Sequence, residues 1–156
     1  MKRSTTRKGP MKLLFPLAIA AMALGGTTKS ADAHIEFEMG SLTSHQVPCA
    51  TLCTTGTFTG GLAGTMDWTM IEMHATPNPD VVVLTGVLTV TTATGTMSGP
   101  DVTLWNLATG QFIDNTKLNS GSGAFAGVKG DLLIIGAFDL AGGEGASTYR
   151  AIVKTP

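Results

Sequence analysis

Apolar and polar residues alternate along most of the chain after residue 34, and threonine and glycine occupy many of the polar positions. Alternation with a period of two is typical of β-strands with one buried face. Threonine favours strands and glycine favours tight turns, and no long stretch has the apolar spacing of a helix. The pattern predicts eight strands, over residues 35–39, 55–59, 65–74, 81–92, 101–107, 111–118, 131–140 and 146–154.

The connections between these strands are short, and glycines mark several turns, including one expected around Gly95 and Gly99-Pro100. Short turns indicate antiparallel pairing, because parallel strands need crossovers of about a dozen residues or more. The fold class is therefore all-β, an up-and-down barrel or a small sandwich. We favour an eight-stranded antiparallel β-barrel, because closure removes exposed edges from such apolar strands. A barrel of this size encloses a packed core or one small ligand.

An outer-membrane barrel is the rival architecture. Such barrels carry aromatic girdles at both membrane interfaces and strands of about 9 to 11 residues. The aromatic residues here are not grouped at strand ends, and several of the predicted strands are shorter than that. The pattern therefore favours the soluble barrel.

Alternation also sorts the side chains of each strand into two faces. In the strand at 65–74 the larger, more apolar face is expected to point inward, and it carries Met66, Trp68, Met70, Glu72 and His74. Matching apolar faces on later strands comprise Val82, Leu84, Leu88, Val90, Leu132, Ile134, Phe138, Leu140, Tyr149, Ala151 and Val153. The candidate ligand-binding residues drawn from this interior are Met66, Trp68, Met70, Phe138 and Tyr149.

Glu72 and His74 are the candidate catalytic residues, two positions apart near the end of that face. A carboxylate and an imidazole at the mouth of an apolar cavity can act as general acid and base. The alternative, which we favour, places both in solvent beyond the barrel rim, where Pro77 turns the chain. Other carboxylates, at Asp101, Asp114, Asp131 and Asp139, fall at predicted turns or strand ends, where solvated acids are ordinary.

Residues 1–33 have the three parts of a secretory signal peptide. Basic residues precede an apolar run of 12 residues at 13–24, and Ala31 and Ala33 supply the small residues of a cleavage site. The run is short for a membrane helix of about 20 residues, so a retained anchor is the less favoured alternative. We expect a secreted or periplasmic protein with no stable membrane span after cleavage. Its expected parts are an N-terminal strand and disulfide-pinned segment over 34–54 and a barrel domain over 55–156.

Loss of the signal changes the charge. The full chain of 156 residues has 10 basic and 11 acidic side chains, but six basic residues and one acidic residue lie within 1–33. Residues 34–156 keep four basic and ten acidic side chains, a net charge of −6. An acidic domain repels phosphate backbones and anionic lipids, so nucleic acid is not an expected partner. No motif calls for a cofactor.

Cys49 and Cys53 are the two cysteines of the chain. In an oxidising compartment an even pair favours a disulfide, which here would pin a local turn after Pro48. The alternative is a metal site that adds His45, with or without His34, to the two sulfurs. Zinc sites usually show tighter paired spacing, so we predict the disulfide and no metal.

The segment Gly121-Ser122-Gly123-Ala124-Phe125-Ala126-Gly127-Val128-Lys129-Gly130 reads G-x-G-x-F-x-G-x-x-G and leads into an apolar strand, and the chain closes with Tyr149-Arg150-Ala151-Ile152-Val153. This resembles the glycine-rich loop of the allene oxide cyclase and dirigent barrel superfamily, including its bacterial secreted relatives. The resemblance implies an eight-stranded antiparallel barrel with an apolar cavity, often in oligomers. The glycines themselves allow positive φ and close backbone approach at a barrel rim, where Phe125 would plug the end.

The predicted function is the binding of a small apolar or amphipathic ligand inside a secreted barrel, with a homo-oligomer as one expected assembly. One alternative is an isomerase or cyclase of the allene oxide cyclase type, which rests on the resemblance. The other is a structural module of the cell envelope without catalysis.

Overall fold

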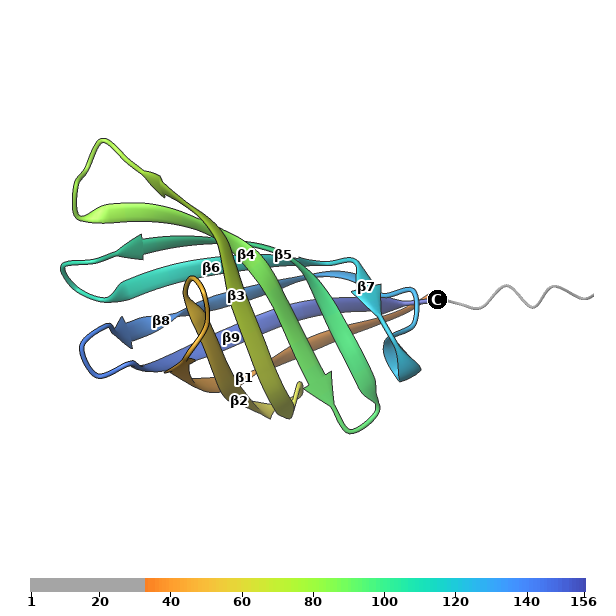
Figure 1. The fold of residues 1–156 in the computed structure, drawn as a ribbon. Coiled ribbons are helices and arrows are strands. Elements are labelled where there is room, and N and C mark those ends of the chain that lie inside the picture. The colour runs from red at the N-terminus through yellow and green to blue at the C-terminus, as the bar shows by residue number, and fades with distance from the viewer. Residues whose placement is uncertain (1–32) are drawn as a thin grey trace, which may run out of the picture. The chain divides into compact units, whose positions relative to one another are not determined.

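The computed structural model describes residues 33–156, so the predicted signal peptide lies, apart from Ala33, outside the described residues. The described chain is all-β, and eight long strands close into one antiparallel barrel, as predicted (Figure 1). The elements are β1 (His34–Val47), β2 (Cys53–Gly60), β3 (Gly64–Ala75), β4 (Val81–Thr92), β5 (Gly95–Asn106), β6 (Gln111–Leu118), β7 (Ser120–Gly121), η1 (Gly123–Phe125), β8 (Lys129–Asp139) and β9 (Glu144–Thr155).

The strands pair in chain order, and β1 completes the circle by pairing with both β2 and β9. The two-residue strand β7 attaches to the start of β5 rather than entering the circle. The sequence pattern predicts residues 34–54 as a segment that precedes the barrel domain. The register shows that β1 is one of the barrel strands, because His34 to His45 pair with β9 along their whole length.

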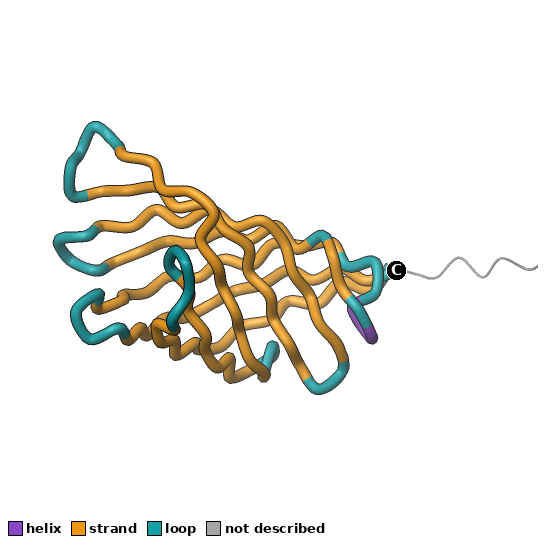
Figure 2. The backbone as a smooth tube through the Cα atoms, viewed as in Figure 1, coloured by secondary structure: helices purple, strands orange, loops and turns teal. Residues whose placement is uncertain are grey.

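The antiparallel order gives the barrel two different ends. The connections at 48–52, 76–80, 107–110 and 140–143 lie at one end, which we call the loop end (Figure 2). The connections at 61–63, 93–94 and 119–128 lie at the other, together with the C-terminus, and we call it the closed end. Alternate side chains of every strand point inward and form one hydrophobic cluster.

The glycine-rich segment covers the closed end. Gly123 and Gly127 have φ of +62° and +76°, the left-handed region that glycine adopts without strain. The short helix η1 brings Phe125 against the core, and Val128 behind it is fully buried. The plug expected from the sequence is therefore present. Within residues 33–156, no helix has the length and hydropathy that a membrane span requires.

One predicted turn is absent from the described chain. The sequence indicated a break around Gly99-Pro100, yet β5 runs unbroken from Gly95 to Asn106. Glycine is needed at position 99 because β5 and β6 approach each other closely there. A Cβ would collide with the backbone carbonyl of Lys117 on β6. The turn itself lies at 93–94.

Tyr149 fastens three strands together near the closed end. Its hydroxyl donates to the carbonyl of Thr59 at 2.9 Å and accepts the backbone N–H of Leu62 at 2.8 Å. Its ring packs edge-on against Phe58, with centroids 4.8 Å apart. To reach them from β9 it passes over β1 at Gly40, where a Cβ would lie 2.8 Å from the ring. Burial raises the pKa of Tyr149, which keeps the phenol a donor.

Replacing Tyr149 by Phe should lower the free energy of unfolding by about 1–3 kcal/mol, because the buried N–H of Leu62 loses its acceptor. Urea denaturation with a fluorescence readout measures the change. Thr148→Val removes a hydroxyl from the adjacent exposed position and should shift stability by less than about 0.5 kcal/mol. Equal losses in the two variants would contradict this role for the phenol.

Candidate functional site

A cavity of about 60 Å³ lies inside the barrel towards its loop end. Aromatic side chains form much of its wall, including both tryptophans of the chain, Trp68 and Trp105, together with Phe112 and Phe138. The other lining residues are Leu42, Ser44, Leu52, Thr54, Met66, Leu84, Leu88, Thr103, Asp114 and Ile134. The cavity is therefore mostly apolar, with a single ionisable side chain in its wall.

That side chain, Asp114 on β6, belongs to a buried group of four polar residues. Asp114 pairs in register with Thr103 on β5, and Thr116 pairs with Asp101 one inward position nearer the closed end. All four side chains are buried. Because the acids stand diagonally across the two strands, each acid has two threonine neighbours.

The hydrogen bonds in this group favour Asp101 as the acceptor. Its Oδ2 accepts the indole N–H of Trp68 at 2.6 Å and the Thr103 hydroxyl at 3.1 Å, and its Oδ1 accepts the Thr116 hydroxyl at 3.1 Å. The same hydroxyls lie farther from Asp114, at 3.5 Å and 3.4 Å. Three donors on one carboxyl group are the pattern of an ionised carboxylate.

Trp68 reaches Asp101 across an intervening strand. Trp68 is on β3, Asp101 is on β5, and the residue of β4 paired with Asp101 is Gly86. A Cβ at Gly86 would lie 2.8 Å from the indole nitrogen, so only glycine leaves room for the ring. The contact therefore depends on three strands being in register.

Burial, followed by the hydrogen bond to Asp101 and the negative charge of Asp101, raises the pKa of Asp114 from 3.8 to about 10. The threonine hydroxyls oppose the shift only in part. At neutral pH Asp114 therefore keeps its proton. The four lysine and arginine side chains of residues 33–156 are all exposed, so none of them compensates the charge of Asp101.

Sequence reasoning missed this group, because it placed Asp101 and Asp114 at turns or strand ends. The structure places both inside the barrel, 1% and 6% exposed. The usable signal was the strand alternation itself. Asp101 lies two positions from Thr103 and four from Trp105, and Asp114 lies two positions from Phe112, so each acid belongs to an inward face.

The predicted ligand-binding residues divide into two groups. Met66, Trp68 and Phe138 line the cavity. Met70 is half-buried against the core but outside the lining, and Tyr149 lies near the closed end. Leu140, expected on an inward face, follows the end of β8 and is exposed.

Glu72 and His74 do not face the cavity. A bulge between Met70 and Glu72 inserts one extra residue, Ile71, into β3 and reverses the alternation beyond it. Glu72 then pairs with Thr85 on the outer face of β4. The two candidates contact each other at 3.2 Å, with side chains 64% and 54% exposed. Because of the bulge, Glu72 and His74 do not point into the barrel as the strand alternation predicts. They lie in solvent, which is the alternative that the sequence favours.

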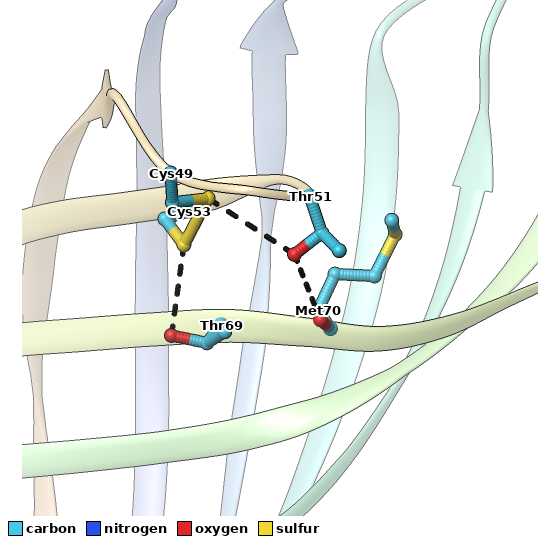
Figure 3. The surroundings of a disulfide bond; sticks show 5 residues. All are labelled: Cys49, Thr51, Cys53, Thr69 and Met70. Atoms are coloured by element: carbon cyan, nitrogen blue, oxygen red, sulfur yellow. Dashed lines mark hydrogen bonds between the residues drawn. A yellow bond between two sulfur atoms is a disulfide. The ribbon is translucent and has the colours of Figure 1, made fainter.

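A disulfide joins Cys49 and Cys53, as predicted (Figure 3). The loop it closes is also tied to β3, because the Met70 N–H donates to the Leu52 carbonyl at 2.9 Å and the Thr51 hydroxyl donates to the Met70 carbonyl at 3.0 Å. This loop carries Leu52 to the cavity wall. The disulfide segment therefore forms part of the rim of the cavity.

The metal site considered as an alternative is not formed. Both sulfurs are bonded to each other, and His34 contacts Glu36 at 2.9 Å at the other end of β1. Across residues 33–156, no group of three or more His, Cys, Asp or Glu side chains is arranged to hold a metal ion.

No protein-family model, curated protein or solved structure matches this chain. The barrel implied by the resemblance to the allene oxide cyclase and dirigent superfamily is present. Membership of that superfamily stays a prediction.

Stability should fall as pH rises, because the folded protein keeps a proton on Asp114 that the unfolded chain releases. The stabilisation is complete below the unfolded pKa of 3.8 and is lost as pH rises to about 10. We expect the melting temperature to decrease from about pH 5 to about pH 9, with a slope of up to about 1.4 kcal/mol per pH unit from this group.

Asp114→Asn should flatten that slope, because the amide resembles the protonated acid but does not titrate. Asp131→Asn is the matched control, since the side chain of Asp131 is half exposed and pairs with Lys117. Calorimetry across the pH range measures all three proteins. An unchanged slope in the Asp114→Asn variant would contradict the assignment of the proton.

Removing the disulfide by Cys49→Ser with Cys53→Ala should loosen the rim loop with little change in global stability, because the closed loop is short. The amide of Met70, bonded to Leu52, should then exchange faster with deuterium. The amide of Leu107, bonded to Asp80 in another part of the loop end, is the internal control. Unaltered protection of Met70 would mean that the hydrogen bonds alone hold the loop.

Proposed function

We propose that the barrel binds one small apolar or amphipathic molecule in the cavity at its loop end. The observation that carries this proposal is the composition of the cavity wall, which is aliphatic and aromatic except for Ser44, Thr54, Thr103 and Asp114. Small-molecule sites are concave, mainly apolar and equipped with a few placed polar groups, and the mouth of a β-barrel is a common location.

The size of the cavity limits what can enter. A volume of about 60 Å³ is less than half that of an apolar cavity of about 150 Å³ that holds benzene. A ligand would therefore place a group of a few heavy atoms inside, and any larger body would extend past Leu52 at the rim. The disulfide supports a secreted or periplasmic location for this protein, since disulfides persist in oxidising compartments.

The isomerase alternative retains one supporting observation. A protonated carboxyl group beside an apolar cavity can act as a general acid, and Asp114 occupies that position. Without a family match there is no substrate to assign, so ligand binding is the function that the wall composition supports better.

Xenon tests the proposal directly, because it enters apolar cavities without specific contacts. Under xenon pressure, the methyl resonances of Leu84, Leu88 and Ile134, which line the cavity, should shift in ¹H–¹³C spectra. Those of Ile113 and Ile135, exposed on the outer face, should stay in place.

Two matched substitutions locate the site. Leu52→Trp adds bulk at the rim and should weaken the xenon shifts by about tenfold or more. Ile113→Trp adds the same bulk to the outer face and should leave them unchanged. Equal responses of inner and outer methyl groups in the parent protein would rule out a binding cavity.

A further inference from the structure

Asp114 presents an acceptor to the cavity that the protein does not fully use. Each threonine hydroxyl has one hydrogen, and in both cases the shorter contact is to Asp101, at 3.1 Å against 3.5 Å or 3.4 Å. The Trp68 N–H also goes to Asp101. Asp114, only 6% exposed, thus keeps only the two longer hydroxyl contacts in the cavity wall.

The interior also lacks a positive charge. Among the described residues the basic side chains are Lys117, Lys129, Arg150 and Lys154, and all are exposed. Buried carboxyl groups are usually paired with a cation or with enough donors to replace water. Here the pair is balanced only by a proton, so a cationic group is the complement that the site lacks.

Charges on the outside are arranged to bring cations to the same end. The exposed acids Glu72, Asp80, Asp139 and Glu144 lie at or beside the loop end. Lys129 begins β8 and Lys154 lies near the end of β9, so both are at the closed end, where they offset the acids Glu36 and Glu38 at the start of β1. With ten acidic and four basic side chains in residues 34–156, the resulting potential attracts cations towards the cavity.

The aromatic wall suits the same charge. Trp68, Trp105, Phe112 and Phe138 all line the cavity, and Trp105 and Phe138 pack edge-on with centroids 5.9 Å apart. Aromatic faces attract ammonium groups, and cages of aromatic rings are a recurrent way to bind amines and their methylated forms. A neutral apolar ligand would not require the carboxyl group, and an anion would be repelled by it.

We propose that the cavity binds the ammonium group of a small amine, with Asp114 as its counter-ion and the aromatic side chains around its carbon atoms. This rests on the proposed ligand-binding function and names its ligand class. On binding, the O–H bond of Asp114 breaks and its proton leaves to solvent. The carboxylate then accepts a hydrogen bond from the ammonium nitrogen, so one proton is released per amine bound.

The pH response of this exchange belongs to the carboxyl pair. Asp101 and Thr103 approach Asp114 from β5, Ile134 is its partner on β8, and Trp68 and Ser44 share the cavity from β3 and β1. Of these groups only Asp101 is titratable. The affinity for an amine should therefore rise with pH while Asp114 still holds its proton.

Ethylammonium and ethanol are suitable probes, because each has three heavy atoms and only the first is charged. An alkylammonium ion resembles a lysine, with a pKa of about 10.4, and so keeps its charge from about pH 5 to about pH 9. Binding is followed by the methyl shifts of Leu84, Leu88 and Ile134. We expect ethylammonium to bind at least about tenfold more tightly than ethanol near pH 8.

The affinity for ethylammonium should rise by about tenfold per pH unit, and that for ethanol should stay constant. Calorimetry in buffers of different ionisation enthalpy should show one proton released per ethylammonium. Asp114→Asn should remove the preference for ethylammonium and retain the response to xenon. Asp131→Asn, which removes a half-exposed acid outside the cavity, should change neither the preference for ethylammonium nor the response to xenon.

Equal affinity for ethanol and ethylammonium, or an ethylammonium affinity that does not change with pH, would overturn the amine proposal. The xenon response would show whether ligand binding itself survives. If xenon also leaves the cavity methyl groups unshifted, both proposals fail. The pH series uses the unaltered protein, so the test stands even if the Asp114→Asn variant does not fold.

Discussion

Closure of the sheet is the constraint on which the other features depend. Once β1 pairs with both β2 and β9, every inward side chain must share one enclosed space, and strand alternation decides which ones do. Side chains that are too large for their own position must lie across a neighbouring strand. Gly40 and Gly86 provide the two crossings, under Tyr149 and Trp68. In both places the polar atom of the aromatic side chain forms a hydrogen bond with the strand on the far side of the one it crosses. The side chain therefore finds room for its ring and a partner for its polar atom at once.

The two crossings serve different ends of the barrel. Tyr149 meets backbone groups near the closed end, where the interior is tightly filled and the polar atoms are those of the chain itself. Trp68 meets a carboxylate at the base of the cavity, where the interior is incomplete. Two acids in an apolar interior oppose folding unless one is neutral and the other is well supplied with donors. Two apolar residues of similar shape would fill the same space at a lower cost in folding free energy. These acids are therefore better explained by the binding of a ligand than by the stability of the fold.

Much of the architecture follows from local pattern. The alternation predicted eight antiparallel strands, a closed barrel and the inward faces of β4 and β9, and the register agrees with each. Strand ends were less predictable, because glycine occurs both in turns and where two backbones approach closely inside a sheet. Gly99 is of the second kind, since it lies within β5 against the backbone of Lys117. The disulfide was predictable because compartment and cysteine number suffice for it.

The candidate site shows where such reasoning ends. The sequence by itself determined the strands, their alternating faces and the pairing of Cys49 with Cys53, since these depend on neighbours along the chain. Only the tertiary structure decided that Glu72 and His74 face outward, because a one-residue bulge arises from pairing with β4. It also brought Asp101, Asp114 and Trp68 together from three strands. Whether an acid is solvated or buried depends on what packs over it, and that is a property of contacts between distant segments rather than of the residues beside it.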